Sequence, residues 1–202
     1  MSTEGNIKFY KIKNEVRIIG IDDAPFDLFK DKRVMLVGAI FRGGQWLDGV
    51  TRTEIDVDGS DATSRIIEMV NRSRHKDLRV IMLDGLTFGG FNVVDIKRLF
   101  EETKLGIVVI VRQMPDFDAI KEALERFDDF DTRWSYIRNA GKPYKVETKD
   151  RKSIYIQVYG IDLEDAKDIV KLSATRSLIP EPVRVAHLIG SGIVLGDSRG
   201  GA

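Results

Sequence analysis

The sequence predicts an α/β fold in which one mixed sheet carries helices on both faces. Two observations lead to this prediction. Residues 33–59 read as a hairpin, with a turn at Arg42 to Gly44 and β-branched residues on the return strand. From residue 60 onward, helical patterns alternate with short apolar runs, as they do where parallel strands are joined by helices. An antiparallel hairpin beside parallel strands makes a mixed sheet.

The strand patterns are short apolar or alternating runs bounded by turn residues. The first run ends in the paired acids Asp22 and Asp23 and turns at Pro25, and a later one ends in Asp84. The expected strands are 16–26, the two arms of the hairpin 33–59, 78–83, 106–112 and 153–161.

The helix patterns show apolar residues at helical spacing behind a capping residue. In the first helix, Ser60 or Asp61 stands at the cap, and Ile66, Ile67 and Val70 follow at that spacing. The expected helices are 60–74, 92–103, 115–127, 162–173 and 180–194, two of them started by a proline.

The chain shows no repeat, low-complexity segment or interdomain linker, so a single domain over residues 1–202 is expected. Residues 139–152 are expected to form a mobile loop. The order strand, hairpin, helix, strand, helix, strand, helix is that of the ribonuclease-H-like folds, which by itself says nothing of chemistry.

Composition excludes several classes of site. Lys plus Arg and Asp plus Glu both total 32, so a polyanionic partner would need a local patch or metal ions to hold it. The absence of cysteine excludes disulfides, thiolate zinc sites and cysteine nucleophiles, and His75 and His187 are too few for a histidine-rich metal site. No signal-peptide or membrane-spanning pattern is evident, so a soluble cytoplasmic protein is expected.

Two acids fall at the ends of predicted strands that would lie side by side. Functional sites in open α/β sheets gather at the carboxyl ends of parallel strands. Asp22 and Asp84 would face each other across one strand spacing, about 5 Å. Two carboxylates that close repel each other unless a cation lies between them, and Mg²⁺, with Mn²⁺ as a substitute, suits such a gap. The bland alternative is that both acids only form turns.

A third acid is expected where the chain enters the first helix. Asp56, Asp58 and Asp61 lie there. One of these three acids would complete a metal site. The alternative is that Asp61 caps the helix and Asp58 makes the turn.

The segment after Asp84 is rich in glycine. Gly85, Gly89 and Gly90 precede a helix whose expected cap is Asn92, so backbone amides there could accept a phosphate or a base edge. Phe88 could stack on a base. The alternatives are a glycine connection that packs closely on the sheet and an aromatic residue that anchors the core.

Five stretches, which together span nearly the whole chain, resemble the mainly archaeal endonuclease dU family. They are RIIGIDDAPF, VDGSDAT, RVIMLDGLTFGGFNVVDI, IPEPVRVAHLIGSGIV and the terminal GDSRG. That family is similar to endonuclease V, a ribonuclease-H-like and magnesium-dependent nuclease that cuts near deaminated bases, mainly inosine.

The resemblance implies a role for several positions. Asp22 and Asp84 fall on the two acidic motifs that bind metal, and Asp61 or Asp58 lies where endonuclease V has a glutamate before the first helix. Arg112 matches a catalytic lysine; its guanidinium could stabilise phosphate charge but is a poor proton donor.

The chain also departs from the endonuclease V pattern. Tyr159 stands where a histidine or acid would complete the metal site, which leaves Asp162 or Glu164 as substitutes if the backbone shifts. His187 is expected to be a core or surface residue rather than a ligand. The residues considered as phosphate contacts are Arg184, Ser198 and Arg199.

The leading hypothesis is a magnesium-dependent DNA endonuclease of base repair that cuts near deoxyuridine or deoxyinosine. One alternative is a nucleic-acid-binding protein of the same fold with weak or no catalysis. Another is an endonuclease for inosine-containing RNA. The residues do not choose between uracil and hypoxanthine, or between a monomer and a homodimer.

Overall fold

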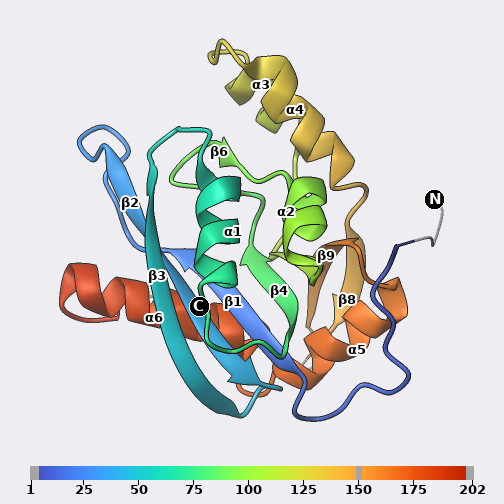
Figure 1. The fold of residues 1–202 in the computed structure, drawn as a ribbon. Helices are drawn as coiled ribbons and strands as arrows, with labels where there is room; N and C mark the ends of the chain where they lie inside the picture. Colours follow the sequence, from blue (N-terminus) through green and yellow to red (C-terminus); the bar gives the residue numbers. More distant parts are fainter. Residues whose placement is uncertain (1–4, 149–151, 199–202) are drawn as a thin grey trace.

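The computed structural model describes residues 5–148 and 152–198, and their backbone forms a sheet with the strand order β3-β2-β1-β4-β7-β9-β8 (Figure 1). The strands of this sheet are β1 (Arg17–Asp23), β2 (Arg33–Arg42), β3 (Trp46–Asp56), β4 (Leu78–Asp84), β7 (Gly106–Val111), β8 (Tyr144–Glu147) and β9 (Ser153–Tyr159). A separate two-stranded hairpin consists of β5 (Thr87–Phe88) and β6 (Asn92–Val93). The helices are α1 (Ala62–Asn71), α2 (Ile96–Thr103), α3 (Phe117–Leu124), α4 (Phe130–Asn139), α5 (Leu163–Ser173) and α6 (Glu181–Leu195).

The sheet is mixed, as expected. Strands β1, β4 and β7 are parallel neighbours, and β2 and β3 form the antiparallel hairpin beside β1. On the other side, β9 pairs antiparallel with β7 and carries β8 at its outer edge. The carboxyl ends of β1, β4 and β7 therefore meet at one edge of the sheet.

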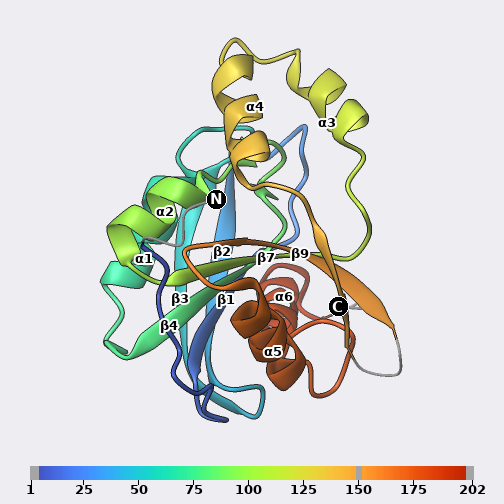
Figure 2. The ribbon, with the colours of Figure 1, turned by 90° about the vertical axis from the view of Figure 1, so that its right-hand side faces the viewer.

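Helices cover both faces of the sheet (Figures 1 and 2). On one face, the side chains of α1 and α2 join Ile19, Ile21, Ile81 and Leu83 in the larger apolar core. On the other face, α5 and the start of α6 pack on a second core whose strand residues include Ile18, Val80, Met82 and Ile110. Alternate residues of one strand point to opposite faces, so the near-continuous apolar runs of β1 and β4 supply both cores.

Helices α3 and α4 project beyond the end of the sheet (Figures 1 and 2). A smaller apolar cluster joins them to the hairpin β5–β6. Within it, Arg133 donates to the carbonyls of Phe91 and Asp58 at 2.6 and 3.0 Å. This contact ties α4 to the glycine-rich segment that follows Asp84.

Three expectations about local structure are wrong. Residues 139–152, expected as a loop, contain the strand β8, whose Val146 is buried. The helix expected at 92–103 begins at Ile96, because residues 87–93 pair as a hairpin. The helix expected at 115–127 is shorter, and α4, which no pattern had indicated, follows it.

Among the residues described, no helix combines the length and apolar character that crossing a membrane requires.

Candidate metal and nucleic-acid site

Asp22, Asp84 and Arg112 come from three neighbouring strands and share one face of the sheet. Asp22 is the next-to-last residue of β1 and lies two residues after Gly20, which faces α6. Asp84 is the last residue of β4 and lies two residues after Met82, which belongs to the core under α5. Arg112 lies just beyond the end of β7, two residues after Ile110, which belongs to the same core. Because residues two apart on a strand point the same way, the three side chains gather at one corner of the sheet.

Helix α6 brings His187 to this corner. The His187 ring nitrogen Nδ1 lies 2.9 Å from Asp22 Oδ2. The helix can approach because Gly20 has no side chain: a Cβ there would lie only 2.2 Å from the backbone carbon of Pro182. The Asp22 carboxylate is 5% exposed and also accepts a hydrogen bond from the Asp23 backbone amide. His187, expected to be a core or surface residue, is therefore a member of the site.

Asp84 lies between an arginine and another acid. Its Oδ2 is 3.2 Å from the Arg112 guanidinium, which is exposed. Burial, and then the charge of Asp22, raise the pKa of Asp84, although Arg112 and His187 act to lower it. The hydrogen bond to Asp22 raises the pKa of His187. The positive charges of Arg112 and His187 thus offset the negative charges of the two acids only in part.

Asp23 points to the opposite face and holds the glycine-rich segment. Its Oδ2 accepts a 2.7 Å hydrogen bond from the backbone amide of Gly89. Burial is the main reason that the pKa of Asp23 rises to about 6, and the charges of Asp22 and Asp84 add to this. Asp23 was part of the acidic pair in the sequence, but no role had been assigned to it.

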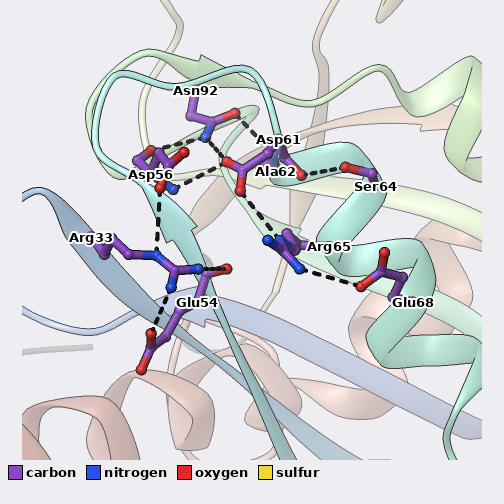
Figure 3. Close-up of polar contacts among 9 residues, drawn as sticks. All are labelled: Arg33, Glu54, Asp56, Asp61, Ala62, Ser64, Arg65, Glu68 and Asn92. Atoms are coloured by element: carbon purple, nitrogen blue, oxygen red, sulfur yellow. Dashed lines mark hydrogen bonds and ion pairs between the residues drawn. The ribbon is translucent and has the colours of Figure 1, made fainter.

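The two candidates for a third acid are engaged elsewhere. Asp61 stands at the start of α1 without capping it through its side chain, and its contacts are drawn in Figure 3. One of its carboxylate oxygens accepts from the Asp56 amide and the Asn92 side chain, and the other lies 3.4 Å from Arg65. Asp58, with a left-handed φ of 53°, accepts from the Phe91 amide and pairs with Arg126. Neither is among the charges that act on Asp23 or Asp84.

Asn92 does not cap the helix that follows it, contrary to expectation. Asp95 caps α2, accepting from the amides of Lys97 and Arg98. The Asn92 side chain is fully buried and instead accepts from the Ala62 amide at the start of α1. Its amide group also donates to the Asp56 carbonyl and to Asp61, so no part of it is available to nucleic acid.

Phe88 is 1% exposed and packs in the core beneath α1, so the base stacking expected of it is wrong in this conformation. Gly89 is also buried, and a Cβ there would meet Val34 at 2.7 Å. Gly90 lies against Asp58 and Leu28. Gly85, which directly follows Asp84, differs from these residues, because a Cβ there would make only ordinary contacts with the Thr87 backbone, at 3.9 and 4.0 Å.

Tyr159 lies at the wrong end of the sheet to complete the site. Strand β9 runs antiparallel to β7, so Tyr159 pairs with Ile107, whereas Asp84 pairs with Ile110. Its ring packs on Phe100, on the opposite face from Asp22. Asp162, which was considered as a substitute for Tyr159, instead caps α5 by accepting a hydrogen bond from the Glu164 amide.

The residues suggested as phosphate contacts remain unassigned. Arg184 makes a close two-point ion pair with the buried Glu181, at 3.0 and 2.6 Å. Ser198 is exposed at the end of the described chain, and Arg199 lies outside the described residues.

The donors at this corner fit a hard divalent cation. Mg²⁺ is typically held by one or two carboxylates with water in its remaining positions, and Asp22 and Asp84 supply two carboxylates from fixed strand ends. The negative charge of these two carboxylates is not fully offset by their neighbours, as the raised pKa of Asp84 indicates. A further positive charge at this corner is therefore favoured. Within the described part of the chain, no three acidic or histidine side chains converge as a ready-made metal cage.

Comparison with known proteins gives concordant matches. The family described as endonuclease dU matches residues 14–194. A UPF0215 protein of Methanothermobacter thermautotrophicus is 59% identical over 98% of this chain and 97% of its own.

Among solved structures, a protein of unknown function from Archaeoglobus fulgidus is 38% identical, with a TM-score of 0.80 over 89% of this chain and 98% of that one. Endonuclease V of Ciona intestinalis, solved with a 24mer DNA containing an inosine followed by a ribo-adenosine, is 15% identical. Its TM-score is 0.55 over 85% of this chain and 82% of that one. The likeness confirms the ribonuclease-H-like fold.

Proposed function

The chain belongs to the endonuclease dU family, and from that membership we propose that it is a metal-dependent endonuclease that cuts DNA near deaminated bases. The family supports a nuclease role. The lesion, the metal and the residues in the roles below are our proposal.

One observation carries the proposal: two acids from adjacent parallel strands share a corner with a histidine and an arginine. Asp22 is hydrogen-bonded to His187, and Asp84 is paired with Arg112. Such a corner presents negative oxygen donors for a cation and positive groups for a phosphate, which is the combination that phosphodiester hydrolysis needs.

Asp22 and Asp84 would hold the metal, which supplies Lewis-acid stabilisation of charge on the phosphate. Asp22 also orients His187, because Nδ1 donates to its carboxylate and leaves Nε2 directed away from that bond. His187 is then placed to hold a water or to move its proton. Arg112 exchanges Asp84 for a phosphate oxygen and stabilises the charge that develops there.

The segment from Gly85 to Gly90 would border the nucleotide at the site. Apart from the residues next to it in the chain, only the Thr87 backbone lies within 4 Å of the position that a Cβ of Gly85 would take, directly after Asp84. Asp23 fixes the segment through the Gly89 amide. A path without side chains suits the close approach of a displaced nucleotide.

The test is cleavage of end-labelled duplexes that contain deoxyuridine, deoxyinosine or only normal bases, each with Mg²⁺, Mn²⁺ or chelator. We expect metal-dependent cutting near one deaminated base. Asp84→Asn and His187→Gln should each reduce the rate at least a hundredfold, because both replace groups at the reacting centre. Asp128→Asn, which neutralises an exposed acid, is the matched control and should cut normally.

The engagement of Asp58 and Asp61 in other contacts favours one alternative, a nucleic-acid-binding protein with weak or no catalysis. Metal-insensitive DNA binding without cutting of any substrate would establish that alternative. Matched RNA strands containing inosine, tested in competition, separate a DNA endonuclease from an RNA endonuclease.

A further inference from the structure

The outer edge strand β3 is bordered by arginines from both sides. A shallow hollow of about 340 Å³ is lined by Arg33, Arg52, Thr53, Glu54, Arg65 and Arg72. A second hollow of about 280 Å³ shares Arg72 and adds Arg74 and His75. We call the five arginines 33, 52, 65, 72 and 74 the arginine edge. Its five arginines outnumber by one the acids that pair with them, which are Glu54, Asp56, Asp61 and Glu68.

These arginines are only loosely engaged. Arg33 and Arg52 both lie 3.4 Å from Glu54, and Arg65 lies 3.4 Å from Asp61 and 3.6 Å from Glu68. Figure 3 shows Arg33 and Arg65 reaching toward the end of β3 from opposite sides.

The other two arginines of the edge, Arg72 and Arg74, are held by still fewer contacts. Among the described residues, their side chains make no ion pair or hydrogen bond. By contrast, the ion pairs Arg184–Glu181 and Arg133–Asp129 are 2.6 Å long. Long, exposed pairs contribute little stability and exchange readily for a better ligand. A phosphate is such a ligand, because it accepts two short hydrogen bonds from one guanidinium.

The strand register places the arginine edge close to the acids. Val37 of β2 pairs with Asp22 on one side and with Arg52 on the other. Arg52 is therefore two strand spacings from Asp22, about 10 Å. Helix α6 covers Val37 between them, so a bound strand that reaches both residues would pass around this helix.

We propose that the arginine edge binds the phosphodiester backbone of the nucleic acid beside the position held at Asp22 and Asp84. This inference rests on the proposed function for the location of the cut. The chain as a whole does not attract a polyanion, so a local surface of this kind has to supply the attraction.

A different role for the same arginines is protection of an exposed edge strand. Charged side chains on such strands prevent them from pairing with other chains. This role predicts that neutral variants would self-associate but bind nucleic acid normally, which gives the two explanations opposite outcomes.

The experiment compares two double variants of the full chain. Arg52→Gln with Arg72→Gln removes two charges from the arginine edge. Arg98→Gln with Arg176→Gln removes two exposed charges elsewhere and gives the same net charge. The dissociation constant of a labelled duplex is measured by fluorescence anisotropy from 25 to 300 mM KCl, with chelator present so that cutting does not interfere. Thermal unfolding and gel filtration check that both variants fold and remain dispersed.

For the arginine-edge variant, we expect binding at 100 mM KCl to weaken roughly tenfold. The slope of log Kd against log salt should fall by about 1.8, since each lost phosphate contact removes about 0.9. The control should match the wild type. Under cutting conditions the variant should show a raised KM with turnover at saturation unchanged.

Equal salt slopes for the two double variants would overturn the inference, as would a wild-type chain that does not bind the duplex at 25 mM KCl. Failure of the proposed function looks different: the wild type cuts nothing, yet the slopes of the two variants still differ.

Discussion

The surroundings of Asp23 disfavour the charged form of its carboxyl group. Burial raises its pKa from the ordinary 3.8 to about 6. A folded state that binds the proton more tightly than the unfolded chain loses stability as pH rises from 3.8 through 6. The cost is fully present above pH 6 and is on the order of 2 to 3 kcal/mol.

Replacing Asp23 by Asn should therefore stabilise the protein at neutral pH. Asparagine keeps an oxygen for the Gly89 amide but carries no charge. In urea unfolding with chelator, we expect the variant to exceed the wild type by about 2 kcal/mol at pH 7.5 and to match it near pH 3.5. An equal difference at both pH values would show that charge is not the cause.

The residues of the site differ in how far the sequence could reveal them. That Asp22 and Asp84 lie at one edge of the sheet was predictable, because each stands at or next to the end of an apolar strand and the ends of parallel strands gather at one edge. His187 was not, since only the packing of α6 on Gly20 brings it to Asp22 from 165 residues away. The contacts of Asp61 and Asn92 were not foreseen, because local spacing cannot show that their side chains bond to each other.

At the scale of elements, the contact between β1 and α6 organises the site. In the variant Gly20→Ala, the added methyl carbon would lie 2.2 Å from the backbone carbon of Pro182 and 2.4 Å from the backbone nitrogen of Val183. Neither is a flexible side-chain end that could move aside. The helix would have to shift, and His187 would move away from Asp22.

We expect Gly20→Ala to cost about 1 to 3 kcal/mol of stability and to abolish cutting. Gly192→Ala is the matched control, since nothing lies within 4 Å of its added methyl group. That change should stabilise α6 by roughly 0.5 to 1 kcal/mol. Thermal unfolding and the cleavage assay test both variants, and normal cutting by Gly20→Ala would refute the role given to this contact.

The elements themselves were predictable where the pattern was long. The parallel strands and their helices follow from apolar runs and helical spacing. The hairpin β5–β6 and the strand β8 were missed because they have two to four residues in each strand, too few to show a period. Helix α4 was missed because its segment is dense with acids. Its residues Phe130, Trp134 and Ile137 nevertheless belong to the apolar cluster that joins α3 and α4 to the hairpin β5–β6.

For the whole molecule, metal binding should appear as stability. Zero net charge means that added Mg²⁺ has little general effect on repulsion, so a stabilisation would report a specific site. At ten times Kd, binding to the folded state alone contributes about 1.4 kcal/mol. For a chain of this size the melting temperature should rise by roughly 3 to 5 °C.

Asp84→Asn should lose most of this rise, whereas Asp128→Asn should keep it. Thermal unfolding with 0 to 20 mM Mg²⁺, and with K⁺ at equal ionic strength, makes the measurement without any cleavage. A rise that K⁺ reproduces would count against a metal site at Asp22 and Asp84.

The pairing of the first strand with the last helix also has a consequence during protein synthesis. A ribosome delivers both acids well before it adds residue 187, which carries the imidazole. Until then β1 and β2 also lack the helix that covers them. A nascent or prematurely terminated chain would hold both carboxylates without the histidine of the proposed site, so the order of translation itself would delay the proposed DNA cutting until the fold is closed.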